Sequence, residues 1–363
     1  MAITVSLCMI VKNEENKLSY CLDSIHDLVD EINIIDTGST DKTVEIAKKY
    51  TDRVFFFEWI NDFSAARNYS FSKATKEYIL WLDADDVIYK DDRIKFKKLK
   101  ETLNKAVDVI YMDYIYKKDE DGKPSIVQSR ERMVKRENNF LWRNKIHEIL
   151  EVSGKYIISD VVVNHDHFDV ERSTERNNKM IEDAVQGENV SARELSYYVR
   201  HLIRDGKYDE ALKYFDEFER LNKESKLPVV EAYIGIYEIY LIYKKDYEKA
   251  YLVLAQNEDI LKDKSEYYCY LGSFAKDILS DYKMAAEYYE KAVLCPCENS
   301  QGIKFMNNMS YYYHIPYYEL GMCYIKLNDY IKAKYAFENA LKYKEDSEVE
   351  SLLEKINELI EKS

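Results

Sequence analysis

The chain has 363 residues, a length that corresponds to two domains of ordinary size or to one large domain. Its composition, with 46% hydrophobic and 33% charged residues but only 9 Gly and 4 Pro, is typical of a folded, helix-rich protein and excludes a disordered or fibrous one. The formal net charge of −14 argues against nucleic acid or an anionic membrane surface as the partner.

The spacing of cysteines and glycines excludes several classes of site. The 6 cysteines form no CxxC pair and no zinc spacing with histidine, which indicates a reducing, cytoplasmic setting. The 9 glycines match none of the spacings of a dinucleotide fingerprint, a P-loop or a nucleophile elbow. Because the sequence shows neither a secretion signal nor a long apolar run, we expect a cytoplasmic protein without a membrane span.

The first half alternates between runs of strand length and helical runs. In chain order, the pattern predicts strands at 3–11, 31–36, 53–58, 78–83 and 107–116, with helices at 14–26, after the turn at 38–40 as far as 50, at 63–74 and at 90–104. These steps predict an α/β domain with a mostly parallel sheet and helices on both of its faces. From 125 to 165 strands follow one another without helices, which predicts an antiparallel extension, and Asp121 and Gly122 are expected in a hairpin turn.

The second half, from about residue 191, is helical throughout and repeats itself. A Tyr-x-x-Ala pattern recurs, each time at the predicted start of a helix, at Tyr208, Tyr247, Tyr282 and Tyr330. The region resembles tetratricopeptide (TPR) helix pairs, whose period is about 34 residues, with an inserted loop at 295–304. Gly272 and Gly321 would let paired helices approach, although an ordinary helical bundle stays an alternative. We expect an α/β domain at 1–185 and an all-α, TPR-like domain at 186–363.

A run of acids follows the predicted strand at 78–83. Asp83 and Asp85, two residues apart in extended chain, lie on the same side of it, and open α/β sheets bind their ligands at the carboxyl ends of strands. Such hard oxygen ligands suit Mg²⁺ or Mn²⁺ on a diphosphate. A cap of the next helix is one alternative, and an aspartyl-phosphate phosphatase is another, although such enzymes carry this motif on their first strand. An EF-hand is excluded, because Ile88 stands where that loop needs glycine.

Further motifs accompany the acid run in a fixed order. They are 8–14 after the first strand, 35–41 after the second, 58–68 after the third, then 142–148 and 164–168. Together these motifs resemble those of inverting family-2 glycosyltransferases with the GT-A fold, of the subgroup with a TPR-like C-terminal region. Within that subgroup the chain is similar to the bacterial peptide S-/O-glycosyltransferases of the glycosylated-bacteriocin type. The resemblance covers about residues 3–170.

The resemblance implies a UDP-sugar donor that carries a hexose or an N-acetylhexosamine, and Mn²⁺ or Mg²⁺ as cofactor. It implies donor contacts from Val11, Glu14, Asp36, Arg67, Asp83 and Ala84. It assigns the metal to Asp85 of the Asp-x-Asp motif and to a histidine, which is His165 by position, with His167 as the alternative. Asp36 has a second interpretation, as a turn former beside Gly38, and Arg67 has one as a surface charge.

The same resemblance places the acceptor chemistry in the motif at 142–148. Glu148 is the expected general base, and His147 would orient the acceptor or the pyrophosphate. A surface acid and a core histidine are the plain structural alternatives. The expected acceptor is a Ser, Thr or Cys side chain of a peptide or protein, because helical repeats commonly bind extended peptides. A cell-envelope or lipid-linked glycan acceptor and an inactive TPR scaffold stay open as alternatives, as does a homodimer through the repeats.

Overall fold

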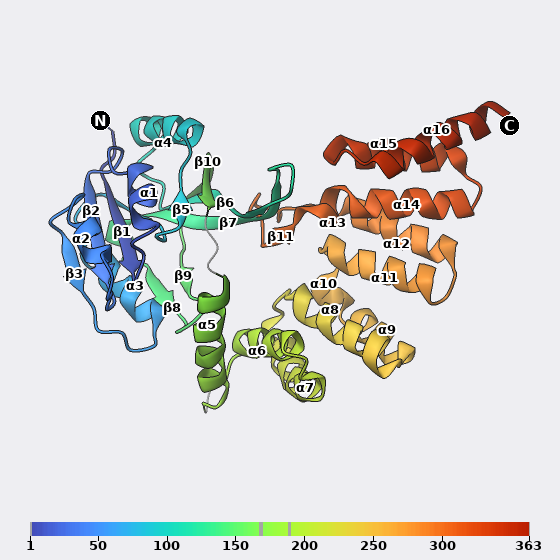
Figure 1. Cartoon of the computed structure of the whole chain (residues 1–363), viewed down its shortest axis with the longest axis horizontal. Helices are drawn as coiled ribbons and strands as arrows, with labels where there is room; N and C mark the ends of the chain where they lie inside the picture. The colour runs from blue at the N-terminus through green and yellow to red at the C-terminus, as the bar shows by residue number, and fades with distance from the viewer. Residues whose placement is uncertain (1, 167–169, 188–189, 363) are drawn as a thin grey trace. The chain divides into compact units, whose positions relative to one another are not determined.

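The computed structural model divides the chain into two compact units (Figure 1). The first comprises Met1–Asn177 and Glu298–Asn307, and the second comprises Asn178–Cys297 and Asn308–Ser363. The structure describes residues 2–166, 170–187 and 190–362. The segment Glu298–Asn307 overlaps the loop that the sequence inserts into the helical region, yet it packs as part of the first unit.

The first unit is built on a mixed sheet. Its strands are β1 (Val5–Val11), β2 (Glu31–Asp36), β3 (Val54–Phe56), β4 (Tyr78–Trp81), β5 (Asp86–Val87), β6 (Val109–Lys118), β7 (Pro124–Lys135) and β10 (Tyr156–His165), in the spatial order β3-β2-β1-β4-β7-β6-β10-β5. Strands β8 (Leu141–Arg143) and β9 (Ile149–Glu151) form a separate antiparallel hairpin, and β11 is Asn307–Asn308. The helices are α1 (Leu18–Asp23), α2 (Thr43–Ala47), α3 (Phe63–Phe71), α4 (Lys90–Thr102), the 3-10 turn η1 (Arg136–Asn138) and α5 (Val170–Val185).

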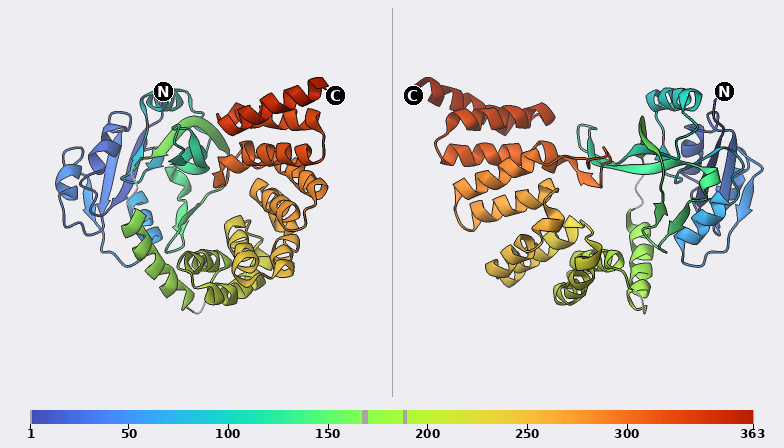
Figure 2. Two further views of the ribbon diagram at one scale, coloured as in Figure 1. Left: turned by 45° about the vertical axis from the view of Figure 1, so that its right-hand side comes forward. Right: turned by 180° about the vertical axis from the view of Figure 1, so that it is seen from behind.

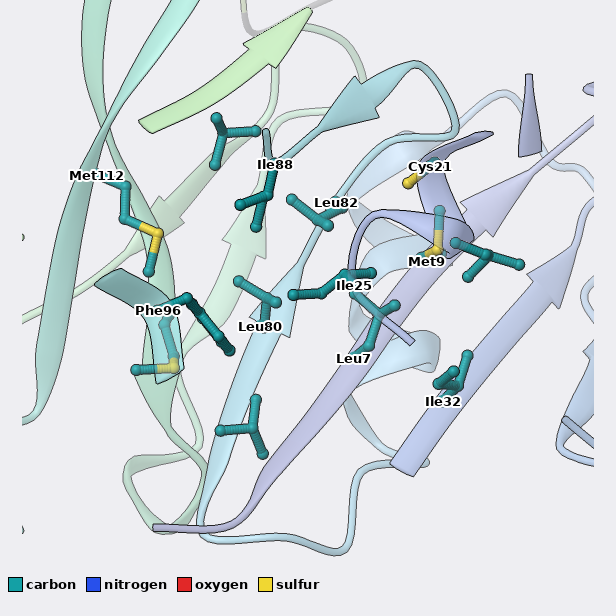
Figure 3. Close-up of a cluster of buried hydrophobic side chains, with 14 of the residues drawn as sticks. Leu7, Met9, Cys21, Ile25, Ile32, Leu80, Leu82, Ile88, Phe96 and Met112 are labelled. Carbon is teal, nitrogen blue, oxygen red and sulfur yellow. The ribbon is translucent and has the colours of Figure 1, made fainter. Parts of the chain in front are cut away.

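Helices cover both faces of this sheet, as the alternating pattern predicts. Leu7 of β1 and Leu80 of β4 belong to one buried cluster, which Figure 3 shows, whereas their neighbours Cys8 and Trp81 belong to a second cluster on the opposite face. The helical partners are Leu22 of α1 and Phe96 of α4 in the first cluster and Phe71 of α3 in the second.

The strand directions confirm one part of the prediction for 125–165 and correct another. Strand β7 runs antiparallel to both β4 and β6, and the turn between β6 and β7 contains Gly122 at φ +77°, as expected for a hairpin. Strand β10, however, pairs in parallel with β6, so the prediction of a purely antiparallel extension is wrong. Between β7 and β10 the chain leaves the sheet as the β8–β9 hairpin. Because β7 returns the chain along the sheet, β6 and β10 can run parallel without the helical crossover that parallel strands usually need.

The second unit is helical. Its elements are α6 (Ala192–Arg204), α7 (Tyr208–Ser225), α8 (Val230–Glu238), the π-helical turn η2 (Ile239–Lys244), α9 (Tyr247–Ala255), α10 (Glu258–Leu261), α11 (Ser265–Asp277), α12 (Tyr282–Leu294), α13 (Met309–Tyr313), α14 (Ile315–Lys326), α15 (Tyr330–Tyr343) and α16 (Ser347–Lys362). Successive helices such as α11 and α12, or α14 and α15, lie side by side (Figure 2). None of the helices in the described part of the chain combines the length and the apolar character that a membrane crossing requires.

The repeated pattern marks real helix starts and contacts in this unit. Each Tyr-x-x-Ala tyrosine is the first residue of a helix, and three of these helices are capped by the carboxylates of Asp246, Asp281 and Asp329. A Cβ atom added to Gly272 would lie 2.8 Å from the ring of Tyr289, and one added to Gly321 would lie 2.6 Å from the ring of Phe337. The two glycines thus allow the close approach of the helix pairs that the sequence predicts.

Candidate functional site

A cavity of about 860 Å³ opens in the first unit at the carboxyl ends of β1 and β4. This is the edge at which open α/β sheets bind ligands. The predicted site residues that line it are Val11, Glu14, Arg67, Asp83, Ala84, Asp85, His147, Glu148 and His165. Side chains far apart in the sequence therefore share one cavity.

Asp36 is the predicted site residue that does not line this cavity. It is 7% exposed, and its carboxylate accepts hydrogen bonds from the backbone N–H groups of Gly38 (3.2 Å) and Ser39 (3.1 Å). This geometry matches the turn-forming interpretation. Asp36 supports the loop whose next residues, Thr37 and Thr40, do line the cavity.

Strand pairing brings His165 next to the acid run. The chain turns after β4, where the Asp83 N–H donates to the Asp86 carboxylate over 2.9 Å, and the short strand β5 then pairs with β10 so that Asp86 lies opposite His165. As a result Oδ1 of Asp85 lies 3.5 Å from Nδ1 of His165, which is also 3.0 Å from the hydroxyl of Tyr114. The pairing of β5 with β10 therefore explains how two distant motifs meet.

Within the described part of the chain, Asp85, Asp86 and His165 present ligand atoms within 4.8 Å of one another. Two carboxylates and an imidazole nitrogen are donors that fit a divalent cation of the Mn²⁺ or Mg²⁺ type. The other predicted candidate, His167, lies outside the described residues.

Asp86 has a second partner that the sequence analysis missed. Its Oδ2 accepts a hydrogen bond from Nη1 of Arg132 over 2.8 Å, and the two side chains are 0% and 1% exposed. The Arg132 guanidinium lies between the rings of Trp81 and Tyr114, 3.9 and 4.2 Å from their centroids. A buried charge needs such a partner, so this pair fixes the acid turn against β7.

A lysine lies between two acids on the α1 side of the cavity. Nζ of Lys17 is 4.0 Å from Oε2 of Glu14 and 3.7 Å from Oδ2 of Asp85. Burial raises the pKa of Glu14 to about 7, although Lys17 opposes the shift. Burial also raises the pKa of Asp85. Both carboxyls are partly buried and lie close to other charged groups, so a cationic ligand would favour their charged forms.

Arg67 of α3 joins the acid turn to the predicted base. Its Nη2 donates to Oδ1 of Asp83 over 2.8 Å, and its Nε donates to Oε1 of Glu148 over 2.6 Å. The guanidinium packs against Trp81 and Trp142, 4.9 and 4.8 Å from their ring centroids. Burial alone would raise the pKa of Asp83, but the positive charge of Arg67 outweighs it and holds that pKa below its ordinary value.

The β8–β9 hairpin, which carries His147 and Glu148, is fastened to α3. The Asn68 side chain accepts from the N–H of Trp142 over 2.8 Å and donates to its carbonyl over 3.0 Å. The N–H of Phe63 also donates to the carbonyl of Lys145 over 2.9 Å. The loop adopts the left-handed region at His147, where φ is +50°. The hairpin therefore depends on α3 for its place at the cavity.

Several lining residues were not singled out from the sequence. They are Lys17, Trp59, Tyr114, Arg130, Arg132 and Arg176. The sequence contains a pattern that could have identified two of them. Arg130 and Arg132 are two residues apart on a predicted strand, so their side chains lie on the same face of the sheet. The others come from positions that only the tertiary fold brings to the cavity.

Comparison with known proteins agrees with this architecture. The sequence profile of Glycosyl transferase family 2 matches residues 6–160, and a tetratricopeptide repeat profile matches residues 315–347. The SPbeta prophage-derived glycosyltransferase SunS of Bacillus subtilis is 28% identical over 223 residues, which are 58% of this chain and 52% of SunS. A TPR repeat-containing protein of Synechococcus elongatus is 49% identical over 82 residues, 23% of this chain and 20% of that protein.

Among solved structures, that of S. aureus TarS 1–349 has a TM-score of 0.35 and 16% identity, and the match covers 79% of this chain and 92% of that one. The chain spans about half the length of SunS and a fifth of the Synechococcus protein. The first unit therefore contains a domain that matches the Glycosyl transferase family 2 profile, and the second unit contains a match to a tetratricopeptide repeat.

Proposed function

We propose that the chain is a metal-dependent inverting glycosyltransferase that moves a hexose or an N-acetylhexosamine from a UDP-sugar to a Ser, Thr or Cys side chain of a peptide or protein. One observation carries the proposal. A single cavity holds the metal-ligand pair Asp85 and His165 and also the carboxylate of Glu148. Glu148 is separated from Asp83 by the Arg67 guanidinium, which pairs with both. Donor activation and acceptor deprotonation need two such groups in one site.

The donor would lie along the sheet edge. Val11, Glu14, Asp83 and Ala84 line this part of the cavity. The carboxylates of Glu14 and Asp83 can accept hydrogen bonds there from the uracil N–H and from ribose or sugar hydroxyls. Asp36 would act indirectly, by shaping the loop after β2.

Asp85 and His165 are the residues that would hold Mn²⁺ or Mg²⁺, whose charge stabilises a departing diphosphate. The nearby ammonium of Lys17 adds positive charge on the same side of the cavity. Together these groups define the leaving-group side of the site.

Glu148 would take the proton of the acceptor. Arg67 engages Oε1, so the proton of the acceptor hydroxyl or thiol would pass to Oε2. As that O–H or S–H bond breaks, the new bond to the anomeric carbon forms on one face while the bond to the diphosphate breaks on the other, which inverts the configuration. UDP leaves with the electron pair. His147, which also lines the cavity, would orient the acceptor.

The helical unit supports a polypeptide acceptor. Stacked helix pairs of this kind present extended surfaces that suit peptide chains. A cell-envelope glycan as the acceptor remains the competing proposal, and the assay below discriminates between the two.

The experiment measures UDP release and product mass with UDP-glucose, UDP-galactose and UDP-N-acetylglucosamine, each with Mn²⁺, with Mg²⁺ and with EDTA. Peptides in which Ser, Thr or Cys is the single nucleophile serve as acceptors, and wall glycan fragments form a separate arm. We expect metal-dependent transfer to a peptide. Transfer to glycan alone would replace the acceptor, and UDP binding without any turnover would indicate an inactive scaffold.

A further inference from the structure

Arg67 directs two of its donors at two different carboxylates of the protein itself. Nε and Nη2, one edge of the guanidinium fork, meet Glu148 and Asp83 over 2.6 and 2.8 Å. The side chain is only 8% exposed. An arginine that binds phosphate presents its planar fork to the ligand. Here two of those donors are already engaged.

Two indole rings pack against this guanidinium. Trp81 is the last residue of β4 and Trp142 lies in β8, with ring centroids 4.9 and 4.8 Å from the Arg67 guanidinium carbon. The two indoles also pack edge to face, 4.9 Å apart. The two indoles and the guanidinium form one compact cluster, and this packing together with the two ion pairs leaves the guanidinium little freedom to turn toward a ligand.

Arg67 also connects two parts of the chain by ion pairs, beside the contact that Trp81 makes with Trp142. Asp83 belongs to the turn that carries Asp85, whereas Glu148 belongs to the β8–β9 hairpin, outside the main sheet. The adjacent residue of α3, Asn68, holds the same hairpin through both backbone groups of Trp142. Two consecutive residues of one helix therefore set the distance between the metal-holding turn and the hairpin.

The burial of Glu148 explains why it needs the ion pair with Arg67. The Glu148 side chain is 14% exposed, and a carboxylate so far removed from water needs a charged partner. Removing the guanidinium would leave Glu148 without this ion pair and free to adopt other rotamers. A displacement of a reacting group by about 1 Å can cost about 10²-fold in rate.

We propose that Arg67 is a positioning residue: it holds the general base Glu148 at a fixed distance from the donor-side carboxylate Asp83, and it is not a ligand of the UDP-sugar. This inference rests on the proposed function, because it assigns Arg67 a part in that reaction. It differs from the donor-binding role that the family resemblance implies.

The test is a double-mutant cycle of Arg67→Lys and Glu148→Gln in the full chain. It is read by UDP release from the UDP-sugar that the wild type uses and by the Kd of UDP with Mn²⁺. Lysine keeps the positive charge but cannot bridge both carboxylates in one plane. We expect each single variant to lower kcat about 10²-fold while the Kd of UDP changes less than about 3-fold. The double variant should lose no more than about 3-fold beyond Glu148→Gln, because the two residues act as one unit.

A donor-binding role would give the opposite pattern. Arg67→Lys would then weaken UDP binding by 10-fold or more, and its effect on kcat/KM would multiply with that of Glu148→Gln; either result overturns the inference. Arg93→Lys is the matched control, since Arg93 pairs with Asp27 in the same unit away from the cavity and should leave kcat unchanged.

A second variant covers the case in which Arg67→Lys does not fold. Trp142→Phe removes part of the ring that packs against the guanidinium and leaves every charge in place, so it should lower kcat with the Kd of UDP retained. Full activity of a folded Trp142→Phe variant would contradict the inference. If the wild type itself shows no turnover with any UDP-sugar, the proposed function fails instead, which distinguishes the two failures.

Discussion

At the scale of single residues, the cavity is a set of charges that hold one another in place. Arg67 and Arg132 are both stacked on Trp81, and they pair with Asp83 and Asp86 of the same turn. Such buried pairs cost desolvation and are retained where geometry matters. The site is therefore organised before any ligand arrives, which is the condition for electrostatic catalysis.

The first prediction concerns Glu148. We expect Glu148→Gln to lower the rate of transfer by about 10²-fold or more, because glutamine cannot accept the acceptor's proton. Binding of UDP, measured by calorimetry, should be retained. Glu151→Gln, in the same hairpin and exposed, is the control and should keep full activity. Near-normal turnover by Glu148→Gln would move the base to another residue.

The second prediction concerns the pH dependence of stability at Glu14. Burial raises its pKa to about 7 in the folded chain, against about 4.3 in an unfolded one. Between these values the folded state binds more protons than the unfolded state, so stability falls as the pH rises from 4.3 to 7. Glu14→Gln should remove this part of the slope in urea unfolding with EDTA present. An unchanged slope would show that Glu14 does not titrate in this range.

At the scale of elements, helix α3 serves the site although it lies outside the acid run. Asp62 caps its start, Asn68 fastens the hairpin and Arg67 reaches Asp83 and Glu148. The short pairing of β5 with β10 likewise positions His165 beside the acid run. Secondary structure here positions side chains that come from distant parts of the sequence.

The third prediction tests the close helix contact at Gly321. Gly→Ala inside a helix ordinarily stabilises by about 1 kcal/mol. At Gly321 the added Cβ would lie 2.6 Å from the ring of Phe337, which is fully buried, so either that ring or the two helices must shift. We expect Gly321→Ala to lower the free energy of unfolding by about 1–3 kcal/mol. The sign of the change in the free energy of unfolding is the test, because a more stable variant would show that Gly321 and the Phe337 ring are not in close contact.

At the scale of the whole molecule, the first unit is not continuous in sequence. The segment Glu298–Asn307 joins it through Lys304, whose Nζ lies 2.6 Å from Asp113 and whose backbone exchanges hydrogen bonds with Ser129 over 2.9 and 3.1 Å. A cut at residue 185 would therefore remove part of the first unit along with the helices.

The fourth prediction follows from this insertion. Lys304→Met should destabilise the full chain by about 1–2 kcal/mol, because it removes a half-buried, charged hydrogen bond to Asp113. Thermal unfolding measures the effect. Lys244→Met, which removes an exposed pair with Asp209, should be nearly neutral. Equal effects of the two substitutions would mean that Lys304 does not anchor the segment.

The sequence predicts what is local and leaves open what depends on distant contacts. The start of β2 at Glu31 and the helix starts at Tyr282 and Tyr330 follow from periodicity and capping, and the structure places them there. The pairing of Arg67 with Glu148, 81 residues away, leaves no local pattern. The pairing of β10 with β6 has the same origin, because β10 lies beside β6 and not beside β7, the strand of the main sheet that precedes it.

The most direct measurement is the affinity of Mn²⁺ for the wild type and for Asp85→Asn, each with and without UDP. The paramagnetic resonance spectrum of the ion reports how much of it is bound. We expect the wild type to bind the ion in the presence of UDP. Asp85→Asn should lower the affinity for Mn²⁺ at least about 10-fold, because it removes one charged ligand of the cluster. Equal binding by Asp85→Asn and the wild type would contradict the assignment of the metal to the turn after β4.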